Sequence, residues 1–172
     1  MQQTDKVFET SRLHIRELRD ADLLEFHEMQ SDDVVMRFTT GHGFDKEENR
    51  RQLQTCIASY TKPNNDFWVW AIIRTSDDRF LGTCAIVSSR EGPEIGYRLL
   101  RKYFGLGYGQ EVCNALIDYG IQAQRLQTLV AYADIRNVAS VKILDRSILR
   151  FVKEVTNNDG GRDRFYRWAS DV

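Results

Sequence analysis

Three glycines at alternate positions, Gly105, Gly107 and Gly109, constrain this chain more than any other feature. They lie between an apolar, strand-like segment, residues 94–100, and a helical pattern over residues 112–123. Glycine adopts backbone angles that other residues avoid, and the amide N–H groups of such a loop are not covered by side chains. N–H groups at the start of a helix attract anions, because the helix dipole adds positive potential. The loop therefore predicts a phosphate or pyrophosphate site, or else a turn that only reverses the chain.

Two familiar phosphate-binding templates do not fit this loop. An NTPase phosphate loop ends in Gly-Lys followed by Ser or Thr, and that triplet is absent from the chain. The dinucleotide fingerprint G-x-G-x-x-G, counted from Gly105, requires a third glycine where Gln110 stands. Counted from Gly107, it requires glycine where Val112 stands. What remains is G-x-G-x-G followed by a helix.

Length and composition are typical of a single soluble domain. The 172 residues, 42% hydrophobic and 28% charged, predict one domain over residues 1–172 with a core that needs neither disulfides nor a metal. The net charge of −1 argues against general affinity for nucleic acid or an anionic membrane. We expect no direct nucleic-acid binding and no membrane association.

The cysteines and histidines indicate neither disulfides nor a metal site. The three cysteines, Cys56, Cys84 and Cys113, are odd in number and far apart, which is typical of buried thiols in a reducing compartment. The three histidines have no spacing that suggests metal ligands. No apolar run approaches the ~18 residues of a membrane span. We therefore expect a cytoplasmic protein without a metal.

Hydrophobic periodicity, with helices interspersed among hairpins, predicts an α/β (α+β) fold in which helices pack on a mixed sheet. Strand patterns occur at seven places, residues 13–18, 67–73, 80–87, 94–100, 128–133, 149–155 and 164–169. Helical patterns occur at about four places, residues 23–29, 46–57, 112–123 and 137–146. Asp45 and Glu48 have the spacing of a capping box at the start of the second helix. The last two strands are predicted to form a hairpin with a polar turn.

Four motifs, in order and at suitable spacings, resemble those of one family. They are residues 9–16 (T-x-R-L-x-I-R type), 94–97 (E-I-G-Y), 104–111 (W-G-x-G-Y-A/G-x-E type) and 137–144 (N-x-A-S-x-x-x-L). Over nearly its whole length the chain resembles the GNAT superfamily of acetyl-CoA-dependent N-acetyltransferases. Within it, the resemblance is to the Rim-type acetyltransferases of ribosomal-protein N-termini. It implies the GNAT acyl-CoA N-acyltransferase fold, a mixed, mostly antiparallel central sheet of about seven strands with about four helices.

The resemblance implies acetyl-CoA as co-substrate, with its pyrophosphate on the N–H groups of residues 106–110. It also implies a strand end, Tyr97 to Leu100, that parts from the next strand and exposes backbone groups to the pantetheine. The implied cofactor-binding residues are Tyr97, Leu99, Leu100, Gly105, Leu106, Gly107, Tyr108, Gly109, Gln110, Asn137 and Ser140. Phe104 stands where the family often has Gln or Arg, so we expect the backbone alone to carry the phosphate charge. A residue larger than alanine at 109 is expected to obstruct the cofactor.

Glu94 is the candidate general base, because an amine must lose a proton before it attacks the thioester. The alternative is an exposed or salt-bridged strand glutamate. Leu144 stands where many family members have the tyrosine that protonates the departing thiolate, so the candidate acid is Ser140, with a water molecule or no acid at all as the alternatives. Asn137 and Ser140 lie one helical turn apart and could face the cofactor, or Asn137 could be an ordinary N-cap. Glu111, in the first turn of its helix, is expected to stabilise the helix dipole.

The resemblance implies an N-acetyltransferase that moves acetyl from acetyl-CoA to a primary amine, foremost a protein N-terminal α-amine. Small-molecule amines are the second class of acceptor, because enzymes of this outline vary the acceptor through loops. A non-catalytic CoA-binding module is the rival from another class. The loop of residues 38–44 is expected to face the substrate, and the protein to be a monomer or homodimer.

Overall fold

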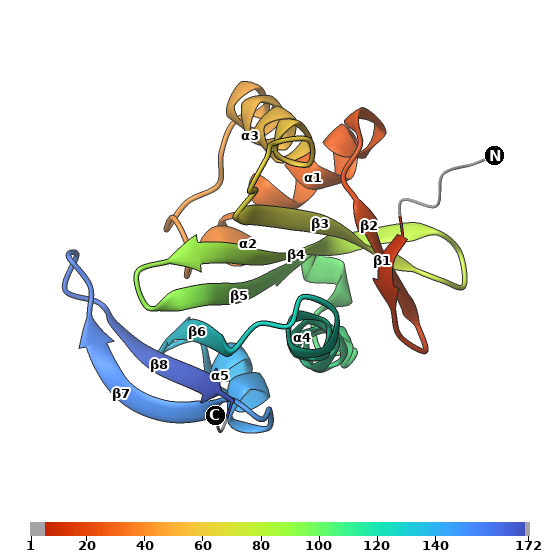
Figure 1. Ribbon diagram of the computed structural model, residues 1–172. Helices are drawn as coiled ribbons and strands as arrows, with labels where there is room; N and C mark the ends of the chain where they lie inside the picture. Colours follow the sequence, from red (N-terminus) through yellow and green to blue (C-terminus); the bar gives the residue numbers. More distant parts are fainter. Residues whose placement is uncertain (1–5, 171–172) are drawn as a thin grey trace.

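The computed structural model describes residues 6–170, which form one eight-stranded sheet flanked by helices (Figure 1). The strand order is β1-β2-β3-β4-β5-β6-β8-β7. The strands are β1 (Lys6–Glu9), β2 (Leu13–Glu17), β3 (Phe67–Arg74), β4 (Arg79–Ser89), β5 (Gly92–Leu99), β6 (Thr128–Asp134), β7 (Arg150–Thr156) and β8 (Arg162–Ala169). The prediction of a mixed, mostly antiparallel sheet is confirmed. The sequence pattern did not predict β1, because its four residues are too few to show a hydrophobic period.

Five α-helices pack on this sheet, one more than predicted. They are α1 (Leu23–Gln30), α2 (Asp33–Met36), α3 (Lys46–Ser59), α4 (Tyr108–Asp118) and α5 (Val138–Asp145). The additional helix is α2, a single turn of four residues that carries no helical periodicity. At the start of α3 the Asp45 carboxylate accepts a 2.8 Å hydrogen bond from the Glu48 N–H, as the capping pattern predicts. No helix in residues 6–170 has the length and apolarity to cross a membrane.

The two faces of the sheet carry separate cores. Helices α1 and α3 lie on one face and α4 and α5 on the other (Figure 1). Because side chains alternate along a strand, β5 serves both faces. Its residues Ile95 and Leu99 belong to the core beneath α4, whereas Arg98 hydrogen-bonds Gln30 at the end of α1.

The parallel contact between β5 and β6 is short, and this decides where a ligand can enter the sheet. Within residues 6–170 the two strands are in register at one pair, Glu94 and Val130. Beyond this pair β5 stays with β4 up to Leu99, while β6 continues with β8 (Figure 1). The C-terminal half of β5 thus lacks a strand partner on one edge, and its backbone groups there remain available to a ligand.

Candidate functional site

The glycine loop begins α4 and presents a set of free backbone donors. Gly105 and Gly107 have φ of +73° and +82°, in the left-handed region that favours glycine. Gly107 is the N-cap of α4, and no side chain caps the helix. The N–H groups of residues 105–110 have no acceptor among the described residues. An anion at this helix start would therefore meet several unpaired donors together with the positive end of the helix dipole.

Arg12, which precedes β2, places a guanidinium beside this loop. Its Nη1 donates to the Leu106 carbonyl at 3.1 Å, and its guanidinium lies 4.3 Å from the centre of the Tyr108 ring. A Cβ added at Gly107 would lie 3.4 Å from Arg12 Nη2. The sequence places no cation at position 104, but the fold supplies one from the N-terminal strand region. The R of the T-x-R-L motif was the only signal that could have pointed to it.

Glu111 connects the loop to the same strand region. Its carboxylate accepts hydrogen bonds from the Thr10 hydroxyl at 2.5 Å and from Arg12 Nε at 2.6 Å. Burial raises the pKa of Glu111, but these hydrogen bonds outweigh it and hold the pKa below its ordinary value. Glu111 is thus an anchor between two distant segments, in addition to its place in the first turn of α4.

Position 109 requires a small residue because α4 packs closely on α5 and β5 there. It is buried, and a Cβ added there would lie 2.9 Å from Ile143 Cδ1 and 3.6 Å from Tyr97 Cε2. The obstruction expected from a larger residue at 109 would therefore arise first inside the protein. Gln110 also belongs to this junction, since its side-chain amide donates to the Ile143 carbonyl at 3.2 Å.

The free edge of β5 is formed by alternate residues. The Leu100 N–H donates to the Leu81 carbonyl on the β4 side at 2.8 Å. Because backbone groups alternate along a strand, the N–H and C=O groups of Tyr97 and Leu99 point to the opposite edge, where β6 has turned away. Leu100 has its N–H engaged and its side chain in the core beneath α1 and α3, so of the three residues only Tyr97 and Leu99 have backbone groups that point to the free edge.

Asn137 and Ser140 lie at the start of α5, on the other side of this free edge. The Asn137 side chain accepts a 3.2 Å hydrogen bond from the Ser140 N–H, so Asn137 is an N-cap. The Tyr97 hydroxyl is buried without a hydrogen-bond partner in the described part of the chain. Burial raises the pKa of Tyr97, and the nearby Ser140 hydroxyl lowers it in part. Two hydroxyl groups therefore lie close together between β5 and α5.

Glu94 occupies the point where β5 and β6 part. Its side chain is half-buried and forms no hydrogen bond or ion pair within residues 6–170. Burial raises its pKa above the ordinary value, and the charge of Asp163 on β8 adds to this effect. By strand alternation Glu94 points to the face opposite Tyr97. A carboxyl group with a raised pKa, free of partners, is suited to accept a proton near neutral pH.

The loop expected to face the substrate approaches the end of β6. The Phe38 ring lies 5.9 Å from the Arg136 guanidinium, which forms an ion pair with Asp134, the last residue of β6. This places Phe38 near the C-terminal end of β6, beyond the point where β5 and β6 part.

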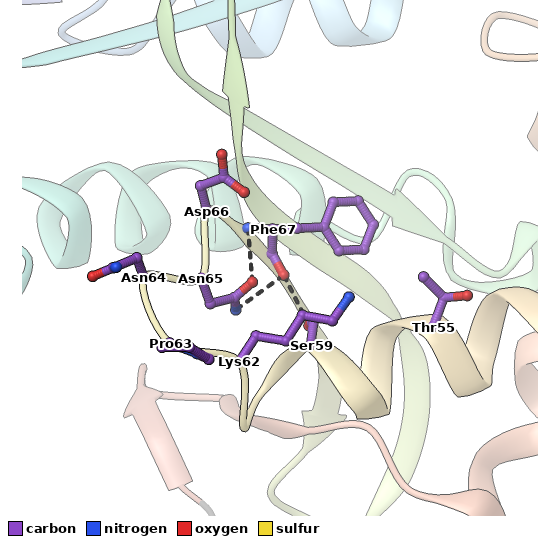
Figure 2. A pocket seen from close by; sticks show the side chains of 8 residues that line it. All are labelled: Thr55, Ser59, Lys62, Pro63, Asn64, Asn65, Asp66 and Phe67. Carbon is purple, nitrogen blue, oxygen red and sulfur yellow. Dashed lines mark hydrogen bonds between the residues drawn. The ribbon is translucent and has the colours of Figure 1, made fainter.

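A separate surface depression of about 320 Å³ lies where α3 leads into β3 (Figure 2). Figure 2 shows polar side chains around it, with Phe67 as its apolar wall. None of the site residues predicted from the sequence lines this depression.

Comparison with known proteins identifies the family. The acetyltransferase (GNAT) domain family matches residues 12–147. The uncharacterized N-acetyltransferase p20 of Bacillus licheniformis is 33% identical over 152 residues, which cover 84% of this chain and 82% of that protein.

Two solved structures have the same fold at low sequence identity. The ribosomal-protein α-N-acetyltransferase RimL in complex with coenzyme A has a TM-score of 0.80 at 15% identity, covering 96% of this chain and 98% of that one. Spermidine N-acetyltransferase from Vibrio cholerae, in complex with CoA and spermine, has a TM-score of 0.78 at 12% identity, covering 93% and 96%. The family match over most of the chain and the shared fold lead to one conclusion: this chain belongs to the GNAT family of acetyltransferases.

Proposed function

We propose that this protein transfers the acetyl group of acetyl-CoA to a protein N-terminal α-amine. The observation that carries the proposal is the arrangement around β5. The cofactor side holds the free strand edge and the unpaired donors of residues 105–110, and Glu94 lies on the opposite face at the point where the strands part. A thioester between the parted strands β5 and β6 would meet an amine beside Glu94 at the point where the strands part. The fold shared with RimL, whose structure contains coenzyme A, supports this placement of the cofactor.

Acetyl-CoA would be held mainly by backbone groups. The N–H groups of residues 106–110 take the pyrophosphate, with the Arg12 guanidinium alongside. The free backbone groups of Tyr97 and Leu99 take the pantetheine, and one of their N–H groups faces the thioester oxygen. Such a donor is worth roughly 3–4 kcal/mol when the oxyanion develops. Asn137, at the start of α5, borders the same gap.

Glu94 would act as general base and Ser140 as general acid. An N-terminal amine has a pKa of about 8, so a carboxylate with a raised pKa can remove its proton at neutral pH. The amine nitrogen attacks the thioester carbon and forms a tetrahedral intermediate. Its collapse breaks the C–S bond and the nitrogen loses its second proton to solvent. The Ser140 hydroxyl relays a proton to the thiolate and takes up another from solvent. Tyr97, whose hydroxyl has no other partner, is placed to support Ser140 in this step.

Two alternatives have specific support. Acetylation of a small-molecule amine is favoured by the fold shared with spermidine N-acetyltransferase. A CoA-binding module without catalysis is favoured by Leu144, which stands in the core at 2% exposure where a tyrosine acid is usual in the family. The three buried free cysteines support a cytoplasmic location.

Release of free CoA thiol, measured with a panel of amines, tests the proposal. We expect turnover with peptides that have a free N-terminus, a lower rate with spermidine, and none with N-terminally blocked peptides. Acetyl-CoA binding without turnover on any amine would favour the module. Faster turnover of spermidine than of every peptide would favour the small-amine acceptor instead.

A further inference from the structure

The β5 strand carries a second row of residues on the face opposite the cofactor gap. Residues Glu94, Gly96 and Arg98 alternate with core residues Ile95 and Leu99, so all three belong to the same face. Arg98 reaches the end of α1, which fixes this face as the one covered by α1 and α3. It is also the face that holds Glu94, where the acceptor amine would enter.

The middle of this row is open. Gly96 is exposed, and a Cβ added to it would have no heavy atom within 4 Å. Its partner across the strand pair is Ala85 on β4, a second small side chain. The two small residues therefore leave a hollow on the sheet surface, with Glu94 at one end and Arg98 at the other.

Among residues 6–170, no carboxylate forms an ion pair with Arg98. Its Nη1 donates to Gln30 Oε1 at 2.5 Å, and its Nε is buried without an acceptor. No described residue accepts a hydrogen bond from its Nη2. Burial is the main influence on the guanidinium and lowers its pKa. A half-buried guanidinium with free donors is stabilised by an oxygen acceptor, which the described part of the chain does not supply at these donors.

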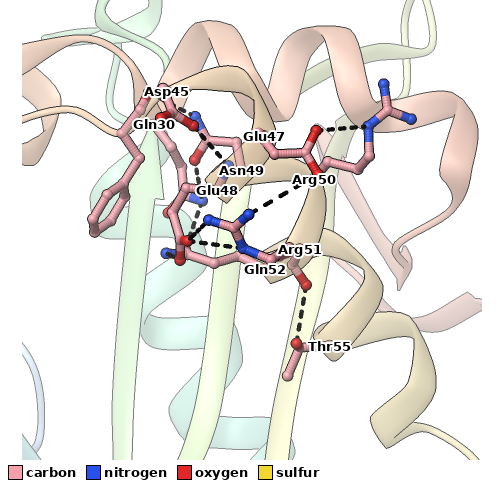
Figure 3. A network of polar contacts seen from close by, with 10 residues as sticks. Gln30, Asp45, Glu47, Glu48, Asn49, Arg50, Arg51, Gln52 and Thr55 are labelled. Atoms are coloured by element: carbon pink, nitrogen blue, oxygen red, sulfur yellow. Dashed lines mark hydrogen bonds and ion pairs between the residues drawn. The ribbon is translucent and has the colours of Figure 1, made fainter.

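Gln30 holds Arg98 in place through a polar network under α3. The Gln30 Nε2 donates to Asn49 Oδ1 at 3.1 Å and to Gln52 Oε1 at 3.0 Å, which leaves Oε1 for Arg98. Figure 3 shows Gln30 among the side chains of α3. Both amide hydrogens are used, so the amide has one orientation and the guanidinium is positioned by it.

The spacing of the row suits an extended peptide. Glu94 and Arg98 are four residue steps apart along the strand, or about 13 Å between their Cα atoms, and Gly96 lies midway. An extended peptide advances about 3.3–3.6 Å per residue and presents a carbonyl oxygen at each step. With its amine at Glu94, a peptide needs about four residues at this advance to cover the whole distance, and the length of the arginine side chain shortens this to the carbonyl of its second or third residue. A polyamine would instead bring a second cation toward the guanidinium.

We propose that Arg98 is an acceptor-binding residue that recognises an oxygen of the acceptor, a peptide carbonyl or a carboxylate, while the amine lies at Glu94 and the first residue fills the hollow over Gly96. This inference rests on the proposed acetyl transfer and defines its acceptor as a peptide N-terminus rather than a polyamine. Arg98 contacts the acceptor and takes no part in the proton transfers.

The test compares Arg98→Met and Arg98→Lys with four amines: a tripeptide amide, the free amino acid of its first residue, an alkylamine of the same length, and spermidine. We expect Arg98→Met to lower kcat/KM for the tripeptide amide about 10-fold or more, the usual effect of a lost charged hydrogen bond. For the alkylamine, kcat/KM should fall by no more than about twofold, because the alkylamine has no carbonyl that Arg98 could bind. The KM for acetyl-CoA should be unchanged, and Arg98→Lys should recover part of the peptide rate.

Gly96→Val tests the hollow without touching Arg98. The φ of Gly96 lies outside the left-handed region and valine favours strands, so the variant should fold and bind acetyl-CoA. We expect its KM for the tripeptide amide to rise about 10-fold, because a blocked hydrophobic contact of this size is worth one order of magnitude. Arg162→Met, an exposed strand arginine of β8, is the matched control for the loss of a cation.

Three outcomes would overturn the assignment of Arg98. These are equal losses for the tripeptide amide and the alkylamine, faster turnover of spermidine than of the peptide by wild type, and an unchanged peptide KM in Gly96→Val. Preference for the free amino acid over the amide would identify the oxygen as a carboxylate.

Calorimetry with CoA-loaded protein and the tripeptide amide separates this inference from the proposed chemistry. If the peptide binds wild type but not Arg98→Met, and nothing is acetylated, the acceptor site stands and the catalytic proposal fails. If the tripeptide amide binds neither protein, or binds wild type and Arg98→Met equally, the proposed acceptor site at Arg98 is wrong.

Discussion

Arg12 Nε donates a 2.6 Å hydrogen bond to Glu111 Oε2, and the two residues are 99 positions apart in the chain. This contact fastens the glycine loop to the strand region at the N-terminus. The Thr10 hydroxyl and the Arg12 N–H bond to the other carboxylate oxygen of Glu111. Two motifs that are weak when considered separately, T-x-R-L and G-x-G-Y-G-x-E, thus meet around one carboxylate.

Replacement of Glu111 by Gln should lower stability by about 1 kcal/mol at neutral pH, a drop of roughly 2–4 °C in Tm for a chain of this size. Because the pKa of Glu111 is lowered in the folded protein, its stabilisation is present above the ordinary carboxylate pKa and is lost as the pH falls through the lowered value. The difference in Tm between the two proteins should therefore shrink in acid. Thermal melts from pH 3 to pH 7 check this (a range of about four pH units around the carboxylate pKa).

Glu154→Gln is the matched control for Glu111→Gln. Glu154 is an exposed strand residue of β7 that pairs with Arg162, and surface pairs contribute about 0–1 kcal/mol. A Tm deficit of Glu111→Gln that persists unchanged in acid would contradict the role of the ionised carboxylate.

Glu94→Gln should reduce kcat about 100-fold or more while leaving acetyl-CoA binding intact, because a positioned base contributes 10²–10⁴-fold. In the wild type the rate should fall as the pH drops through the raised pKa of Glu94, since the protonated carboxyl cannot act as a base. Asp163→Asn removes one cause of the raised pKa and should move this acid limb to lower pH.

The stability of Glu94→Gln separates catalysis from unfolding. The folded-state pKa of Glu94 is raised, so the contribution of this group to stability is lost as the pH rises through that value. The glutamine variant should therefore be at least as stable as wild type at neutral pH. An unchanged rate and pH profile would show that Glu94 is not the base.

Gly109 and Ile143 should be energetically coupled. Gly109→Val places a side chain where Ile143 Cδ1 lies 2.9 Å from an added Cβ, and we expect a loss of about 1–3 kcal/mol from overpacking. Ile143→Ala removes the opposing group, so the double variant should lose less stability than the sum of the two single variants. A double-mutant cycle from urea melts measures the difference. Additive losses would mean that the two helices do not need the glycine to pack.

Asn137→Ala should lower stability by about 1 kcal/mol through loss of the N-cap of α5. Asn137→Ser keeps a capping oxygen and should restore the stability. If Asn137 also contacts the cofactor, both variants should raise the KM for acetyl-CoA, because serine is too short to replace the amide. If Asn137→Ser and wild type have the same KM for acetyl-CoA, Asn137 caps α5 and does not contact the cofactor.

The three cysteines should not react with thiol reagents while the protein is folded. All are buried, and burial raises the pKa of Cys56 to about 11 and of Cys113 to about 12, so neither forms a thiolate at neutral pH. Titration with a thiol reagent should therefore give no fast reaction before denaturant is added. Reaction of all three after unfolding is the internal control.

The sequence alone determined the local structure and the family. Hydrophobic period, capping residues and turn signals predicted most strands and helices, because these depend on neighbours within a few positions. The glycine loop indicated an anion site for the same local reason. The sequence did not predict the short elements α2 and β1, because four residues are too few to show a hydrophobic period.

Only the tertiary structure decided how the site is completed. Strand alternation could assign Glu94, Gly96 and Arg98 to one face, but it could not show that Gln30 binds Arg98 or that, within residues 6–170, no carboxylate pairs with it. The same holds for Arg12 at the glycine loop and for the packing of Gly109 on Ile143. These contacts join segments tens of residues apart, and their partners are fixed by how the helices pack on the sheet rather than by any spacing along the chain.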